Sequence, residues 1–227
     1  MAESRDKKLF EYLTQFVTDE KIEIFRKVLN QRTRHITVVL EDIYQPHNAS
    51  AVLRSCDGFG IQDVHIIENR NYFEVNKGVA IGSDKWLTIN RYHQLKVNNS
   101  ALCMNRLRNE GYRIIATTPH KNDYDLPDLP ISEKVAVFFG AEKEGLSQYV
   151  LDEADDYVKI PMYGFSESFN ISVSVALTLY DLTSRLRKLN LNWQLNEKEK
   201  FDLLLEWVKK SIRRSDLIEQ KFNEHSN

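Results

Sequence analysis

Short apolar segments alternate with amphipathic ones through most of the chain. Segments rich in β-branched residues predict β-strands at 36–41, 64–67, 86–89, 112–117, 134–139 and 157–160. Helical patterns lie between them: one begins near Ala49, one covers 99–110 and ends at Gly111, and one covers 146–154. This alternation predicts an α/β domain with a largely parallel sheet.

The two ends of the chain have a different pattern. Residues 4–17 and 18–32 each combine a capping residue with an amphipathic run, and 196–222 forms a third helical pattern. A chain of 227 residues with 42% hydrophobic content can bury one core. We therefore expect an α/β domain over 35–190, an N-terminal helical extension over 1–34, and a C-terminal one over 191–227.

The net charge of −2 is unevenly distributed. Residues 1–34 carry eight Lys or Arg against six Asp or Glu, and residues 185–227 carry ten against seven, whereas the middle carries thirteen against twenty. Basic terminal segments can bind along the phosphate backbone of a nucleic acid, although a helix with mixed charges usually just presents a solvated face. In the segment "KKSIRR", the candidate phosphate contacts are Lys210, Arg213 and Arg214.

Composition also limits the class of protein. Cys56 and Cys103 lie in apolar helical patterns, without a CxxC motif or a nearby His pair, so we expect reduced thiols and no metal site. No apolar run approaches the roughly 20 residues that span a bilayer, and the first residues lack a signal-peptide pattern. We expect a cytoplasmic protein with no membrane contact.

Ligands of α/β domains collect at the carboxyl ends of strands, so the segments after strands are the candidate sites. The first is "QPHNASAVLRSCDGFG", residues 45–60. Asn48 precedes the predicted helix and is placed to cap it. Arg54 projects from a helix face of small residues, where it is either a ligand contact or a solvated side chain.

The second segment is "VFFGAEKEGLS", which follows a buried strand. Gly140 permits close backbone approach, either to a planar ligand or within a tight turn. Glu142 and Glu144 enter the turn that ends at Gly145, where a carboxylate can accept from a ligand or cap the helix beginning near Ser147.

The third segment, "YVKIPMYGFSESFNISVSVA", runs from a strand into an apolar helix. Ser168 and Asn170 lie at the helix entrance, where hydroxyl and amide groups are also ordinary capping groups. Three common site patterns are absent: the phosphate-binding GxxxxGK[ST], the nucleophile pattern GxSxG and the zinc-binding HExxH. The GxG formed by Gly58 and Gly60 lies at the end of a predicted helix and not at its start, where it would bind phosphate. Three such segments in one domain favour a site that is neither a P-loop nor a zinc centre.

These segments carry a family resemblance. "EDIYQPHNASAVLRSCDGFGIQDVHII", "FFGAEKEGLS" and "VKIPMYGFSESFNISVSVA" resemble, in order and spacing, the three motifs of the SpoU (TrmH) group of SPOUT RNA ribose methyltransferases, over about 36–190. The form "PHNASAVLR" is closest to the branch that methylates the 2′-hydroxyl of guanosine 18 in the tRNA D-loop. Phe169 stands where the family usually has Leu, a change that could reshape the cofactor pocket.

The resemblance implies a homodimeric enzyme that uses S-adenosyl-L-methionine and acts on tRNA. It also implies a deep trefoil knot in the α/β domain, which periodicity does not show and which general topology rules disfavour. The implied cofactor-binding residues are Thr117, Gly140, Ala141, Glu142, Lys143, Glu144, Ile160 and Phe169.

The resemblance assigns the activation of the ribose hydroxyl to Arg54. As a base Arg54 would have to lose a proton that a guanidinium holds far above neutral pH; as a cation it would stabilise the developing alkoxide and hold the adjacent phosphate. Asn48 and Glu142 would position Arg54 or the ribose, and Ser168 and Asn170 would hold the phosphate and the first motif. Two alternatives stay open: a ribosomal RNA or another tRNA position as substrate, and a catalytically silent RNA-binding module.

Overall fold

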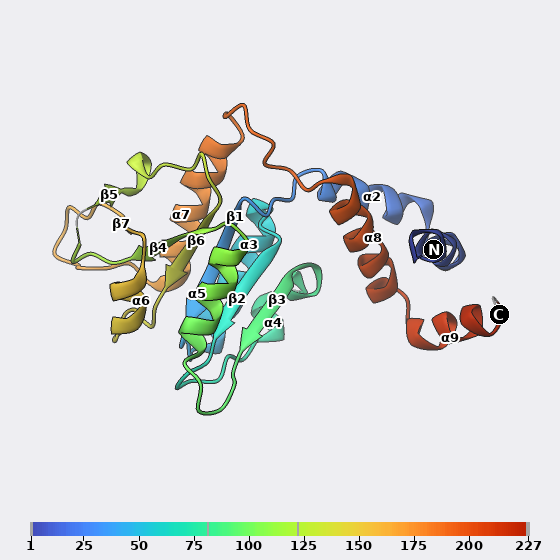
Figure 1. Ribbon diagram of the computed structural model, residues 1–227, viewed down its shortest axis with the longest axis horizontal. Coiled ribbons are helices and arrows are strands. Elements are labelled where there is room, and N and C mark those ends of the chain that lie inside the picture. Colours follow the sequence, from blue (N-terminus) through green and yellow to red (C-terminus); the bar gives the residue numbers. More distant parts are fainter. Residues whose placement is uncertain (1, 81, 122, 226–227) are drawn as a thin grey trace. The chain divides into compact units, whose positions relative to one another are not determined.

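The computed structural model describes residues 2–80, 82–121 and 123–225. Its contacts divide the chain into two units (Figure 1). One is the α/β unit, Thr33–Trp193, and the other is the helical unit, which combines Met1–Arg32 with Gln194–Asn227.

The α/β unit contains a parallel sheet in the order β3-β2-β1-β6-β4-β7-β5. The strands are β1 Ile36–Glu41, β2 Asp63–Ile67, β3 Thr88–Tyr92, β4 Arg113–Thr117, β5 Tyr124–Asp125, β6 Val135–Phe139 and β7 Asp156–Lys159. The inner strand β1 pairs with β2 on one side and with β6, the middle strand of the sheet, on the other. The predicted α/β class and parallel sheet are confirmed, while the implied knot stays a prediction.

Helices cover both faces of this sheet (Figure 1). They are α3 Pro46–Phe59, α4 Lys77–Ala80, α5 Asn99–Asn109, α6 Gln148–Glu153 and α7 Ile171–Leu186, with the short 3-10 turns η1 Ser83–Trp86 and η2 Leu126–Asp128. Val38 packs in the cluster that includes α3 and α7, and its neighbour Val39 packs in the cluster that includes α5 and α6. Because successive side chains point to opposite faces, a strand covered on both sides has no exposed residues, and all six residues of β1 are buried.

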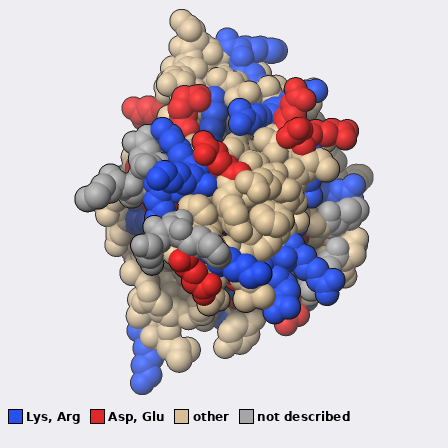
Figure 2. Space-filling view, turned by 90° about the vertical axis from the view of Figure 1, so that its right-hand side faces the viewer, with Lys and Arg blue, Asp and Glu red and all other residues tan. Residues whose placement is uncertain are grey.

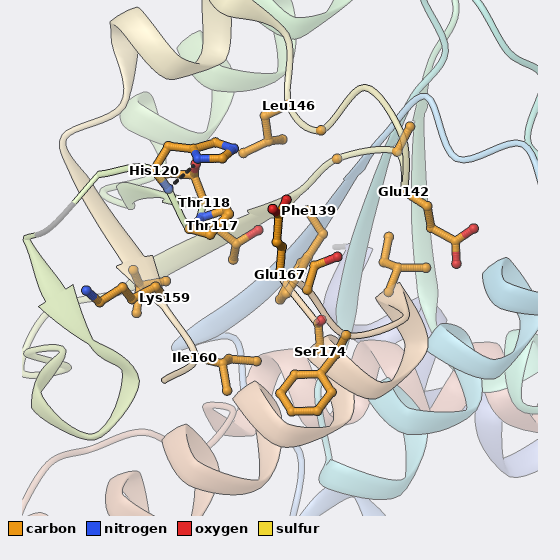
Figure 3. A pocket seen from close by; sticks show the side chains of 18 of the residues that line it. Thr117, Thr118, His120, Phe139, Glu142, Leu146, Lys159, Ile160, Glu167 and Ser174 are labelled. Carbon is orange, nitrogen blue, oxygen red and sulfur yellow. Dashed lines mark hydrogen bonds between the residues drawn. The ribbon is translucent and has the colours of Figure 1, made fainter. Parts of the chain in front are cut away.

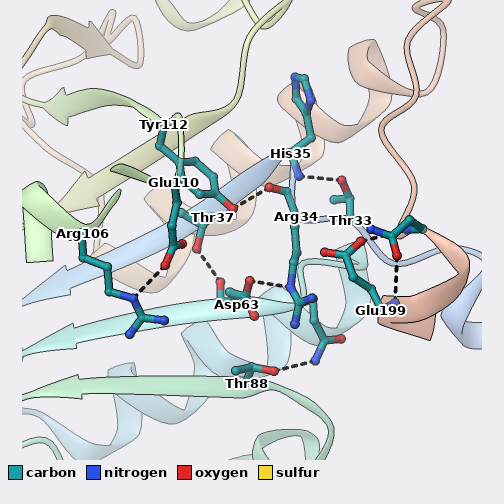
Figure 4. Close-up of polar contacts among 12 residues, drawn as sticks. Thr33, Arg34, His35, Thr37, Asp63, Thr88, Arg106, Glu110, Tyr112 and Glu199 are labelled. Carbon is teal, nitrogen blue, oxygen red and sulfur yellow. Dashed lines mark hydrogen bonds and ion pairs between the residues drawn. The ribbon is translucent and has the colours of Figure 1, made fainter. Parts of the chain in front are cut away.

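The amino ends of β1 and β2 are joined by polar contacts (Figure 4). Arg34 Nε lies 2.8 Å from Asp63 Oδ2, and the Thr37 hydroxyl donates to the Asp63 carbonyl at 2.7 Å. The Tyr112 hydroxyl donates to the Arg34 carbonyl at 2.6 Å. These contacts are structural, and the ligand cavity described below lies at the opposite, carboxyl ends of the strands.

The helical unit consists of α1 Ala2–Thr14, α2 Asp19–Leu29, α8 Glu197–Ser211 and α9 Ser215–His225. Its core includes Phe25, whose ring meets Trp207 edge-on with centroids 5.7 Å apart, and Arg32, whose guanidinium lies 5.4 Å from the Trp207 ring. No helix in the described part of the chain is long and apolar enough to cross a membrane.

The prediction of one helix over 196–222 was wrong at its centre. The chain leaves the helix after Ser211, and Arg214 has a positive φ of 59°. Because of the break, α9 packs back against α8 and α1. Lys209 Nζ of α8 lies 2.8 Å from Glu219 of α9, and the Phe222 ring of α9 lies 5.4 Å from the Tyr12 ring of α1. Neither Gly nor Pro marks the break, so the local sequence has no signal for it.

The strand predicted at 86–89 starts later than expected. Trp86 ends η1, and β3 begins at Thr88. The Gln62 side-chain amide donates to the Trp86 carbonyl at 3.2 Å and to the Thr88 hydroxyl at 3.1 Å. These contacts fix the entry into β3, so tertiary hydrogen bonds decide a boundary that apolar residues alone place two positions too early.

A buried histidine makes the stability of the α/β unit sensitive to acid. The His65 ring stacks on Tyr92, and its Nδ1 lies 3.0 Å from the Tyr92 hydroxyl. Burial, reinforced by the positive charge of Arg106, lowers the pKa of His65 to about 4. Since the unfolded chain takes up this proton near pH 6.5 and the folded chain does so only near pH 4, acid favours unfolding between those values.

We expect His65 to remove about 3 kcal/mol from the free energy of unfolding as the pH falls from 7 to 4. Urea unfolding of the wild type and of His65→Gln across this range measures the effect. The variant, which has no proton to gain, should lose about 3 kcal/mol less than the wild type. Equal losses in both proteins would assign the acid sensitivity to other groups.

Candidate functional site

A cavity of about 330 Å³ lies at the carboxyl ends of β4, β6 and β7 (Figure 3). This volume falls within the range of small-molecule sites in proteins. Its walls come from residues 117–120 after β4, residues 139–146 at the end of β6, residues 158–160 of β7 and beyond, and the loop and first turns of α7. The position agrees with the expectation that ligands of a parallel sheet bind beyond its carboxyl edge.

The turn at residues 140–146 forms one wall of the cavity. It closes tightly, since the Gly145 amide donates to the Ala141 carbonyl at 2.8 Å and Gly145 has a φ of +68°. A Cβ atom on Gly140 would lie 2.1 Å from the Gly145 carbonyl carbon and 2.2 Å from the Leu146 nitrogen. Gly140 therefore serves the turn itself, which crosses directly over it.

The residues that sequence analysis assigned to a cofactor all border this cavity. They are Thr117, Gly140, Ala141, Glu142, Lys143, Glu144, Ile160 and Phe169, and Ser168 lies beside them. The lining residues include the acidic Glu142, Glu144 and Glu167 and the basic Lys143 and Lys159. The cavity can thus meet a ligand that carries charges of both signs.

A hydrogen-bonded cluster next to the cavity joins the three motif segments. Asn48 Nδ2 donates to Glu142 Oε1 at 2.8 Å, and Asn170 Nδ2 donates to the same oxygen at 2.7 Å. Asn170 Nδ2 also lies 3.2 Å from Asn48 Oδ1. Residues that are 94 and 122 positions apart in sequence meet at this carboxylate and amide cluster.

The capping role predicted for Asn48 was wrong. Helix α3 begins at Pro46, so Asn48 is its third residue, and the cap residue Gln45 makes no side-chain capping bond. Proline suits the first helical position because its missing N–H would be unpaired there anyway. The Asn48 amide is therefore directed to Glu142 and to Gln45 Oε1, at 2.7 Å from the latter.

Asn170 caps a helix, as predicted, and also contacts the other two motif segments. It is the N-cap of α7, where its Oδ1 accepts from the Ser172 amide at 2.9 Å. Its Nδ2 is the group that reaches Glu142. One side chain thereby fixes the start of α7 and the neighbouring turn.

Arg54 lies apart from this cluster. It is exposed on α3, as predicted, but it does not line the cavity, and the described residues include no hydrogen bond or ion pair to its guanidinium. Asn48 and Arg54 are six residues apart, which is about 9 Å along a helix. The structure thus brings Asn48, Glu142 and Asn170 together and leaves Arg54 facing solvent.

Several lining residues were missed by sequence analysis. His120 follows the predicted strand 112–117, Lys159 lies near the end of the predicted strand 157–160, and Glu167 precedes Ser168 in the loop before α7. The rule that ligands collect at the carboxyl ends of strands could have identified the first two. Glu167 had no signal of its own, because an acidic residue in a polar loop is ordinary.

Residues 35–180 match the model of the SpoU rRNA methylase family. The chain belongs to this family. The match covers all three motif segments and the sheet that places them.

Individual relatives support the family assignment. The tRNA (guanosine(18)-2′-O)-methyltransferase of Borreliella burgdorferi is 44% identical over 93% of this chain and 94% of that protein. The crystal structure of the TrmH/SpoU tRNA modifying enzyme of A. aeolicus, 25% identical, aligns with a TM-score of 0.76 over 86% of this chain and 98% of that one. The SpoU methyltransferase AviRb of Streptomyces viridochromogenes in complex with AdoMet, 20% identical, shares the fold with a TM-score of 0.59 over 71% and 64% of the two chains.

Proposed function

We propose that this chain is a tRNA (guanosine(18)-2′-O)-methyltransferase that uses S-adenosyl-L-methionine. The main support for this proposal is that the three motif segments meet at the Asn48, Glu142 and Asn170 cluster, beside a cavity of cofactor size. The relative that bears this name and matches nearly the whole chain supports the choice of substrate. A tRNA substrate also implies a cytoplasmic enzyme.

The cavity residues fit S-adenosyl-L-methionine. When bound, this cofactor supplies a methyl group on a positively charged sulfonium. Among the lining residues, Glu144 and Glu167 are acidic and suit the cationic groups of such a ligand, and Lys143 is basic and suits its carboxylate. Apolar wall residues suit the adenine ring; they are Leu126, Leu146, Leu151 and Ile160.

Arg54 is proposed to act on the RNA side of the reaction. A ribose hydroxyl becomes a good nucleophile only as its proton leaves, and a fixed cation stabilises the negative charge that develops on its oxygen. The planar guanidinium can also hold the adjacent phosphate with two parallel hydrogen bonds. A guanidinium keeps its proton far above neutral pH, which favours this role over that of a base.

The Asn48, Glu142 and Asn170 cluster is proposed to hold the site in shape around the ribose. The Glu142 carboxylate takes two amide donors, which fixes the first motif against the turn and against the start of α7. Ser168, in the loop directly before Phe169 and Asn170, has an exposed hydroxyl for the substrate phosphate. Positioning of this kind can contribute several kcal/mol to a transfer between two bound reactants.

The enzyme is proposed to work as a homodimer through α7. Val173, Leu177 and Tyr180 are exposed apolar residues at helical spacing, so they share one face of this helix. Tyr180 is 64% exposed and touches the Phe59 ring, with centroids 6.4 Å apart. A second copy would cover this face, and sedimentation of the purified protein measures its association.

The helical unit is proposed to bind the tRNA backbone. Lys and Arg side chains lie among Asp and Glu on the face shown in Figure 2. Arg213 and Arg214 are exposed in the break between α8 and α9, and Lys210 is paired with Glu206. Phosphate contacts of this kind position an RNA without reading its sequence.

We expect Lys210→Gln, Arg213→Gln and Arg214→Gln together to weaken tRNA binding and flatten its salt dependence. The slope of log K against log salt should fall by roughly 0.7 to 0.9 for each phosphate that the variant no longer neutralises. Filter binding at several salt concentrations measures it. The matched variant changes Lys8, Arg26 and Lys27, exposed residues of α1 and α2, to Gln; an altered slope in that variant alone would move the RNA surface to the N-terminal helices.

The proposed function is tested with methyl-labelled S-adenosyl-L-methionine and separate pools of tRNA and ribosomal RNA. We expect label in tRNA, mapped to the 2′-hydroxyl of guanosine 18, and none in a transcript that lacks this guanosine. Label in ribosomal RNA or at another tRNA position would replace the substrate assignment. RNA binding without any methyl transfer would support a silent binding module.

A further inference from the structure

Glu41, the last residue of β1, is a buried carboxylate outside the roles assigned above. It is 1% exposed. Its Oε2 accepts from the Ser147 amide at 2.7 Å, and its Oε1 accepts from the Ser147 hydroxyl at 2.7 Å and from the Ser100 hydroxyl. Two chain segments far from β1 in sequence therefore meet at this one side chain.

A carboxylate in this place is energetically costly. Taking one out of water costs several kcal/mol unless hydrogen bonds replace the lost hydration. The neighbouring strand residues Leu40 and Phe139 are apolar and equally buried, so packing alone does not require a charge here. The donors around Glu41 are instead small polar groups that it holds in position.

Ser147 connects Glu41 to the cavity. It follows Leu146 directly, and the Leu146 side chain is part of the cavity wall (Figure 3). It is also the N-cap of α6, where its hydroxyl accepts from the Val150 amide at 3.4 Å. The end of the 140–146 turn is thus attached to Glu41 by two hydrogen bonds.

The same turn has a second anchor near its beginning. Glu142 is held by Asn48 from α3 and by Asn170 from the start of α7. Glu41 and Asn48 both belong to the segment formed by β1 and the first helical turn after it. This segment therefore fixes the turn at two points, one on each side of Lys143, Glu144 and Gly145.

We propose that Glu41 is a positioning residue for the methyl-donor cavity. It holds Ser147, and through Ser147 it keeps the 140–146 turn in the shape that receives the cofactor. The identity of the ligand rests on the proposed function. Glu41 acts on cofactor affinity and not on the transfer step, because it touches neither the cavity nor Arg54.

The test is cofactor binding by calorimetry with S-adenosyl-L-methionine and the purified full chain. Glu41→Gln keeps the side-chain shape but replaces one carboxylate oxygen with an NH₂ group. This group cannot accept the hydrogen bonds that Ser147 and Ser100 donate to Glu41. We expect the Kd to rise about tenfold or more, as for a hydrogen bond to a charged group, with kcat at saturating cofactor and tRNA within about twofold of wild type. A role in general folding alone would not separate Kd from kcat in this way.

The two serines provide a matched pair, because each donates one hydroxyl to the same carboxylate. Ser147→Ala should raise the Kd, Ser147→Thr should restore it, and Ser100→Ala should leave it near the wild-type value, since Ser100 lies on α5 away from the turn. If Glu41 acts through Ser147, the double variant Glu41→Gln with Ser147→Ala should bind no more weakly than the weaker single variant. If Glu41→Gln does not fold, the comparison of Ser147→Ala with Ser100→Ala still tests whether the contact to Ser147 controls cofactor affinity.

Glu68→Gln controls for the loss of any buried carboxylate. Glu68 follows β2, is 8% exposed, and accepts from the Phe73 amide at 2.7 Å and from Arg91. It should change the melting temperature but not the cofactor Kd. Wild-type protein that binds no cofactor would refute the proposed function, whereas wild-type affinity in both Glu41→Gln and Ser147→Ala would overturn the role of Glu41 alone.

Discussion

Arg54→Ala is expected to reduce methyl transfer by about two to three orders of magnitude, the cost of removing one group that stabilises developing charge. Cofactor affinity should stay at the wild-type value, because Arg54 does not line the cavity. Single-turnover transfer to tRNA and calorimetry with S-adenosyl-L-methionine measure the two quantities separately. The separation is the point of the test, since a general folding defect would reduce both.

Two further variants define what Arg54 contributes. Arg54→Lys should also fail, because one ammonium group cannot reproduce two parallel hydrogen bonds from a planar fork. Arg106→Ala is the matched control: Arg106 is a helix arginine whose Nε pairs with Glu110 at 2.8 Å. Turnover near the wild-type rate in Arg54→Ala would remove Arg54 from the reaction.

Gly140→Ala is expected to abolish measurable cofactor binding and to lower the free energy of unfolding by about 3 kcal/mol or more. The added Cβ would lie 2.1 to 2.2 Å from backbone atoms of Gly145 and Leu146, which cannot turn aside as the end of a side chain can. The turn that forms the cavity wall must open to admit it. Calorimetry and urea unfolding measure the two losses.

Gly58→Ala is the matched control for this substitution. Gly58 lies inside α3, and a Cβ there meets nothing within 4 Å. Alanine should therefore leave cofactor affinity unchanged and raise the free energy of unfolding by roughly 0.5 to 1 kcal/mol. Cofactor affinity near the wild-type value in Gly140→Ala would show that the turn is not required in this shape.

Much of the α/β unit was predictable from local pattern. The runs 36–41 and 134–139 are mostly apolar without alternation, as expected for strands buried on both faces, and they became β1 and β6 within one residue at each end. Gly60 and Gly111 end helices with φ of +80° and +82°, a conformation that glycine adopts without strain. The segments chosen as candidate sites were those that follow strands, and the cavity lies there.

Other features had no local signal. The order of the strands, with β6 between β1 and β4, depends on which apolar surfaces pack together, and apolar runs carry no information about partners. The break at 212–214 exists because α9 packs back within its own unit. The role of Glu41 was also missed, because its donors Ser100 and Ser147 are 59 and 106 residues away.

The sequence by itself determined the class of fold, the segments that form the site, and through its motifs the family. These depend on residue type and short spacing, which repeat wherever the same local geometry is needed. Only the tertiary structure decided that Asn48, Glu142 and Asn170 share hydrogen bonds, that Arg54 lies outside the cavity, and that Gly140 is crowded by its own turn. Such contacts join residues distant in the chain, and their geometry follows from how the sheet and its helices pack together.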